Sequence, residues 1–139
     1  MILVDSGPLV AVGARDDRHH KACTDLLAST NEELLVPATV TAEVCYLLES
    51  RGGSASEAAF LRLFTAGKLT PVDITTDDYE RMADLVEQYS DFPLGGTDAS
   101  VIAIAERLGV NTVATLDRRH FAAIQPRHVE AFTLLPETL

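Results

Sequence analysis

Four acidic residues occupy positions from which their side chains could act together. Asp5 ends a short apolar run that is typical of a buried strand, and Asp117 ends a later run of the same kind. Glu43 lies one turn into a helix among apolar residues, and Asp98 lies in the first turn of the most apolar helix. Because ligand sites in open α/β sheets gather at the carboxyl ends of strands, we expect these four carboxylates to meet at one edge.

Such a cluster has a specific chemical requirement. Carboxylates held a few ångströms apart without a counter-charge take up protons or move apart. A divalent cation removes that repulsion, and a set of oxygen ligands with no suitable His or Cys companions favours Mg²⁺ or Mn²⁺. The ion can position a water, lower its pKa and neutralise charge on a phosphate under attack. The pattern therefore predicts metal-dependent chemistry on a phosphate.

Simpler interpretations exist for two of these acids. Thr97 or Asp98 could cap the helix that begins there, and Asp117 could close a turn before Arg118. Asp5 has no comparable capping need, because the strand that it ends is the first element of the chain. We interpret several other acids as solvated groups on polar helix faces or in first turns, namely Asp16, Asp17, Asp77, Asp78, Glu80 and Asp84.

Apolar periodicity predicts the elements that must hold these side chains. Strands are expected at Ile2–Asp5, Leu34–Val36, Leu69–Ile74, Thr112–Leu116 and Ala131–Leu135. Helices are expected at 17–29, Thr39–Ser50, from Ser54 to Gly67, Thr75–Gln88 and Thr97–Leu108, the third opened by a capping box at Ser54–Glu57. Alternation of strands and helices predicts an α/β fold, with a central, mostly parallel sheet of about four to five strands flanked by helices on both faces.

Composition limits the classes of protein. The 139 residues, 47% apolar and 23% charged, suit one globular domain over residues 1–139, with no run long enough to span a membrane. Cys23 and Cys45 alone cannot form a disulfide scaffold or a complete zinc site, so a reducing cytoplasm fits best. The formal net charge of −10 disfavours a simple nucleic-acid-binding module, but not an enzyme that reaches phosphates through a cation. Three bases, Arg118, Arg119 and His120, directly follow Asp117 and could contact phosphates, although exposed charges without a specific role explain them equally well.

Four motifs in order resemble the PIN-domain ribonucleases, and specifically the VapC-like toxins of type II toxin–antitoxin systems. They are ILVDSG at 2–7, VTAEV at 40–44, GTDASVIA at 96–103 and VATLD at 113–117, with Phe121 following. Each motif alone is weak, whereas the ordered set is fairly specific and covers nearly the whole chain.

The resemblance implies a PIN-like three-layer fold and a metal-dependent endoribonuclease. By it, Asp5, Glu43 and Asp98 form an acidic triad around Mg²⁺ or Mn²⁺, and Asp117 matches a fourth, more variable acidic position. Ser6 and Thr97 match hydroxyl positions that could orient a carboxylate or a water, although local turn and cap bonding explains them equally well. The implied partners are an RNA substrate and a cognate VapB-like antitoxin.

A homodimer is also expected, from the resemblance and from apolar residues on one helix, at Phe60–Leu61 and Leu63–Phe64. Tyr46 we expect to pack against the protein, with stacking on an RNA base as the alternative. The alternatives are a phosphatase-like or receiver-like domain, or a PIN-like scaffold without activity. The Asp-x-Asp pattern of haloacid-type phosphatases is absent at Asp5, and no late lysine suits a receiver domain. A scaffold would be expected to lack one or more of the four acids.

Overall fold

The computed structural model describes residues 1–139 and has one five-stranded sheet. The strands are β1 (Ile2–Val4), β2 (Leu34–Pro37), β3 (Thr70–Val72), β4 (Thr112–Ala114) and β5 (Thr133–Leu135). They lie in the order β3-β2-β1-β4-β5, and every neighbouring pair is parallel. The prediction of a mostly parallel α/β sheet is confirmed.

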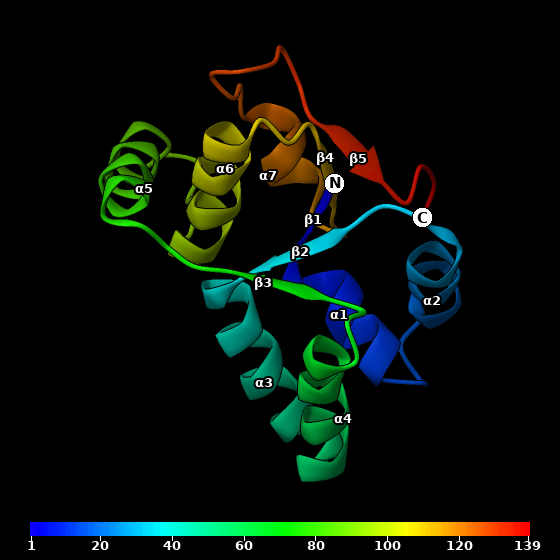
Figure 1. Ribbon diagram of the computed structural model, residues 1–139. Helices are drawn as coiled ribbons and strands as arrows, with labels where there is room; N and C mark the ends of the chain where they lie inside the picture. Colours follow the sequence, from blue (N-terminus) through cyan, green and yellow to red (C-terminus); the bar gives the residue numbers. More distant parts are fainter.

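Helices cover both faces of this sheet, which gives three layers (Figure 1). One layer holds α1 (Ser6–Gly13), α2 (His20–Ser29), α3 (Ala38–Gly52) and α4 (Ser54–Thr65). The other holds α5 (Thr76–Gln88), α6 (Gly96–Leu108) and α7 (Arg118–Ala123). Helix α7 was not predicted, because six residues are too few to show a helical period.

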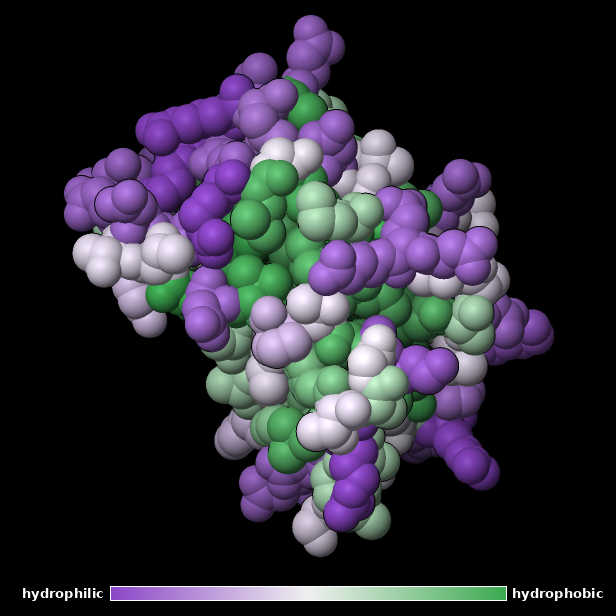
Figure 2. All heavy atoms as spheres, in the orientation of Figure 1, coloured by the Kyte–Doolittle hydropathy of each residue, from purple (hydrophilic) through white to green (hydrophobic).

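The core lies on the two faces of the sheet. Strand β1 is the central strand of the sheet. Its Leu3 pairs with Leu35 of β2 on one side and with Val113 of β4 on the other. Helix α6 is buried from Ala99 to Ala105, as its nearly continuous apolar sequence predicts, and it also packs against α5. Hydrophilic side chains cover α5, at the upper left of Figure 2, whereas hydrophobic ones gather in the middle of that view.

Two predictions at helix starts were wrong. Helix α4 has no side-chain cap: Gly53, with φ of 78°, precedes it, and Ser54 is already helical. The capping box lies instead at α5, where Thr75 and Asp78 bond each other's backbone N–H. Asp78 is not solvated but 3% exposed, because Arg107 of α6 binds it.

Two large side chains on α3 and α4, Tyr46 and Leu61, are exposed. Tyr46 does not pack: 69% of it is exposed. In α4, Phe60 is buried while Leu61 is 43% exposed, so the apolar residues of this helix are divided between core and surface. No helix is both long and apolar enough to cross a membrane.

Candidate active site

The order of the strands puts a change in the direction of winding at the centre of the sheet. From β1 the chain moves outward through β2 and β3 on one side, while β4 and β5 lie on the other. Ligands of open α/β sheets bind where the direction of winding changes, at the carboxyl ends of the strands. Asp5 directly follows β1, and Asp117 follows β4 by three residues. Both acids therefore lie beside this switch point.

Asp5 is the most deeply buried acid of the site, at 5% exposed. Its Oδ2 accepts a hydrogen bond of 2.9 Å from the hydroxyl of Thr115, which is fully buried. The same hydroxyl accepts a bond of 2.9 Å from the backbone N–H of Asp117. Thr115 thus links the two strand ends that carry the acids.

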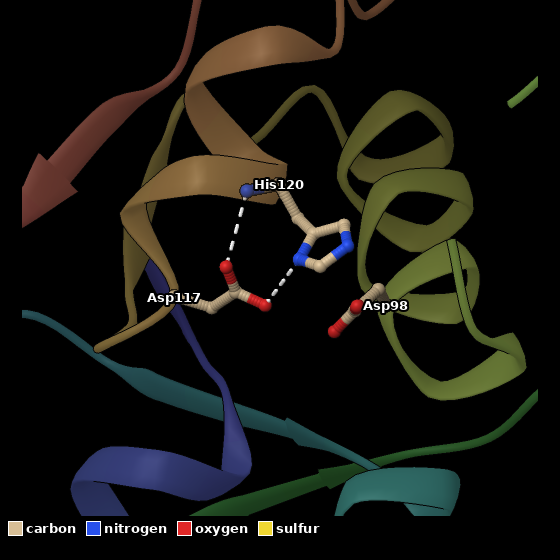
Figure 3. Close-up of side chains that lie close together, drawn as sticks. All are labelled: Asp98, Asp117 and His120. Atoms are coloured by element: carbon tan, nitrogen blue, oxygen red, sulfur yellow. Dashed lines mark hydrogen bonds and ion pairs between the residues drawn. The ribbon is translucent and has the colours of Figure 1, made fainter. Parts of the chain in front are cut away.

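The carboxyl group of Asp98 points toward Asp117 and His120 (Figure 3). Three residues, Asp98, Asp117 and His120, each offer one ligand atom, and these three atoms lie within 4.8 Å of one another. The three residues could therefore hold a metal ion. Nδ1 of His120 lies 2.7 Å from Oδ2 of Asp117, and the backbone N–H of His120 donates to Oδ1. Asp117 therefore caps α7 and orients the imidazole at the same time.

Glu43 reaches the site from α3. Its Oε2 accepts a hydrogen bond of 2.7 Å from Ser6, the residue next to Asp5. The start of α3 is tied to α6 by a hydrogen bond of 2.5 Å between the hydroxyls of Thr39 and Ser100. This bond joins the helix of Glu43 to the helix of Asp98.

The acids change one another's protonation. The pKa of Asp98 rises from an ordinary 3.8 to about 7, first because the carboxyl is buried and then because Asp5 and Asp117 are negative. Glu43 adds to this rise, and His120 opposes it. Burial likewise raises the pKa of Asp5, although the N–H of Ser6 and the hydroxyl of Thr115 act against it. Such mutual effects require all four carboxyls to lie near one another.

One oxygen in this cluster lacks any partner. Oδ1 of Asp5 is buried and accepts no hydrogen bond. A buried carboxylate oxygen without a partner is costly, and a bound cation would satisfy it. The donor set, mainly carboxylate oxygens, fits a hard divalent ion such as Mg²⁺ or Mn²⁺.

The simpler interpretations of two acids have different outcomes. Asp98 is not a cap: Gly95 precedes α6, and no side chain bonds the first N–H groups of that helix. Asp117 does act as the cap of α7, so local structure explains part of its placement. The hydroxyl of Ser6 orients Glu43, whereas Thr97 contributes its backbone carbonyl, which accepts from Ser100.

Sequence reasoning missed two residues of the site. Thr115 is two positions before Asp117, and residues two apart on an extended segment point to the same side, so this spacing could have indicated it. For His120 the sequence indicates only one of three bases that directly follow Asp117. Its i+3 position from Asp117 on a helix would have predicted their contact, had α7 been recognised.

Comparison with known proteins shows the family of the chain. The family model described as PIN domain matches residues 2–125. Ribonuclease VapC26 of Mycobacterium tuberculosis is 32% identical over 135 residues, which are 97% of this chain and 100% of that protein.

Two solved structures share the fold. M. tuberculosis VapC20, described as a sarcin–ricin loop cleaving toxin, superposes with a TM-score of 0.77 at 21% identity, over 81% of this chain and 87% of that one. A toxin–antitoxin complex from Klebsiella pneumoniae gives a TM-score of 0.68 at 19% identity, over 89% and 92% of the two chains. The alternative interpretations of the strand-end acids, as part of a receiver-like or phosphatase-like domain, are not supported by these similarities. On the match to the family model and the full-length similarity to a VapC ribonuclease, the chain belongs to the PIN domain family, among its VapC-like members.

Proposed function

We propose that this protein is a metal-dependent endoribonuclease that hydrolyses RNA phosphodiester bonds, and that it is the toxin of a toxin–antitoxin pair. The observation that carries the proposal is the partnerless, buried Oδ1 of Asp5 within a cluster of carboxylates. The full-length similarity to a ribonuclease supports the choice of RNA as substrate. Residues 1–139 would act as a single PIN-like domain in the cytoplasm.

In this proposal Asp5 and Asp98 hold the ion most directly, and Glu43 and Asp117 complete the site. When bound, Mg²⁺ or Mn²⁺ supplies a Lewis acid that lowers the pKa of water and offsets charge on the phosphate. Protonation of Asp98, with its pKa of about 7, competes with the ion near neutral pH.

The remaining polar residues position these acids. Ser6 holds the carboxylate of Glu43, and Thr115 holds that of Asp5. The imidazole of His120, with its proton on Nδ1, fixes the orientation of Asp117. Hydrogen bonds of this kind around a metal site set the orientation and the basicity of the ligands.

A VapB-like antitoxin is the proposed partner, supported by the likeness to a toxin–antitoxin complex. A cavity of about 560 Å³ between α1, α2 and α4 offers an apolar surface to such a partner. A second hollow of about 280 Å³ shares Val12, Leu27 and Leu63 with it. The acid cluster would in turn attract an Arg or Lys of the partner, since a guanidinium pairs well with carboxylates.

Cleavage of RNA tests the proposed activity. Purified protein is incubated with short single-stranded RNA of mixed sequence in Mg²⁺, in Mn²⁺ or in EDTA, and the products are separated by size. We expect cleavage with either ion and none in EDTA. Asp98→Asn should lose at least about 100-fold in rate, the scale of a lost electrostatic contribution. Asp77→Asn, an exposed acid in α5, is the matched control and should cleave normally.

If the wild-type protein leaves the RNA uncut in Mg²⁺ and also in Mn²⁺, the proposed function is wrong. Normal cleavage by Asp98→Asn would instead contradict the assignment of the site.

A further inference from the structure

The guanidinium of Arg119 lies on an aromatic ring that also contacts His120 of the site. The guanidinium of Arg119 is 5.0 Å from the centre of the Phe92 ring, over its face. Phe92 belongs to the loop between α5 and α6, shortly before Asp98, and it also packs on His120 with ring centres 4.9 Å apart. The Phe92–Arg119 pair therefore connects the segment that carries Asp98 with the segment that carries Asp117.

Ion pairs involve four of the 11 lysines and arginines, and Arg119 is not among these four. Acids outnumber bases by 21 to 11, and Lys21, Arg51, Arg81 and Arg107 each pair with a carboxylate. Arg119 is exposed and makes no ion pair, although Asp117 is only two residues away. Contact with Phe92 holds the guanidinium plane in place while its N–H groups remain free to donate.

We propose that the Phe92–Arg119 pair binds a phosphate of the RNA strand next to the one that is cut. This inference rests on the proposed function. An RNA strand that approaches four carboxylates meets repulsion on both sides of the reacting phosphate. The guanidinium of Arg119 offsets that repulsion and donates two hydrogen bonds to one phosphate, with no dependence on base sequence.

The chemistry of the pair gives a ranked expectation. Arg119→Ala removes the charge and the hydrogen bonds, so RNA should bind about tenfold more weakly. The slope of log affinity against log salt should fall by about 0.7, which corresponds to one contact with a single-stranded phosphate. Arg119→Lys keeps the charge but loses the planar fork, so it should retain the slope and recover only part of the affinity. Phe92→Leu should lose part of the affinity with an unchanged slope.

Binding is measured with short single-stranded RNA of mixed sequence in the Asp98→Asn background with Mg²⁺, over a series of salt concentrations. Arg62→Ala is the matched control: Arg62 is exposed, makes no ion pair and lies on α4, in the opposite layer. We expect Arg62→Ala to bind RNA within about twofold of the background protein, as for loss of a distant, screened charge. Equal weakening by Arg119→Ala and Arg62→Ala, or by neither, would overturn the inference.

Cleavage kinetics separate this inference from the proposed function. With Asp98 intact, Arg119→Ala should raise KM and leave kcat unchanged, because the contact acts in binding. A lower kcat at unchanged KM would overturn the phosphate-binding role. If wild-type protein cleaves no RNA, the proposed function fails, while the binding comparison still decides whether Arg119 contacts the strand.

Discussion

The pKa of Asp98 shows how strongly the surroundings in the site change the protonation of one residue. Its folded pKa of about 7 lies above its ordinary 3.8, so between these values the folded protein without metal holds a proton that the unfolded chain has released. The free energy of unfolding therefore decreases as pH rises from about 4 to 7 and stays low above 7. Asp98→Asn removes this dependence and should stabilise the metal-free protein at neutral pH by on the order of 2 kcal/mol.

Thermal unfolding in EDTA at a series of pH values checks this prediction. The wild-type melting temperature should fall relative to Asp98→Asn as pH rises, and the two should converge near pH 4. Parallel curves would mean that Asp98 is not perturbed in the folded protein.

Thr115 is the second residue for which the site makes a sharp prediction. Its hydroxyl donates to Asp5 and accepts from the N–H of Asp117. Thr115→Val has nearly the same shape but can make neither bond, so Asp5 would lose a group that lowers its pKa. We expect cleavage and Mn²⁺ affinity to fall by about 10- to 100-fold, as for other groups that orient metal ligands.

Thr115→Ser restores the hydroxyl and is the control. Titration calorimetry with Mn²⁺ should show its affinity close to that of wild type. If the valine variant also binds Mn²⁺ normally, the hydroxyl does not position the acids.

Among the elements, the α5–α6 pair depends on ion pairs outside the site. Burial acts to raise the pKa of Asp78, but hydrogen bonds from Arg107 and Thr75 outweigh it and lower the pKa. Nearby, Arg81 binds both oxygens of Glu106. These contacts hold α6, the helix that carries Asp98, against α5.

Asp78→Asn should therefore destabilise the fold by about 2 kcal/mol, because Arg107 would lose its charged partner. The adjacent Asp77 is exposed, and Asp77→Asn should change stability by less than about 0.5 kcal/mol. Since the folded pKa of Asp78 is lowered, its contribution is present above pH 3.8 and is lost as pH falls further. Urea unfolding at neutral pH measures both variants; equal stability would show that the ion pair contributes nothing.

At the scale of the whole molecule, we predict a homodimer. Tyr46 on α3 and Leu61 on α4 are exposed apolar or aromatic side chains, at 69% and 43%. A hollow of about 340 Å³, lined by Leu61, Phe64 and Val72 among others, lies between α3, α4 and β3. Association of two copies would remove this surface from water.

Sedimentation at micromolar concentrations tests the dimer. We expect a mass twice the 15.0 kDa of the chain. A single species near 15.0 kDa at all concentrations would contradict it.

Local patterns in the sequence were sufficient for the architecture. Apolar runs and helical periods depend on neighbouring residues, and so all five strands and five of the seven helices could be predicted from them. The four acids were recognised for the same reason, because a strand end and a helix start are local features. The longest-range inference, that the acids meet, needed only the rule that parallel strands end at one edge.

Other features depend on contacts between residues distant in sequence, and only the tertiary structure decided them. The order of the strands places Asp5 beside Thr115, 110 residues later, and no local pattern specifies that order. The sequence predicts that Asp78 is a solvated acid, whereas in the structure Arg107, 29 residues away, donates a hydrogen bond to its carboxylate. Tyr46 is aromatic and was expected to pack, but 69% of it is exposed. Burial and pairing are properties of the packed chain, which is why the sequence alone predicted the elements and the acids but not these partners.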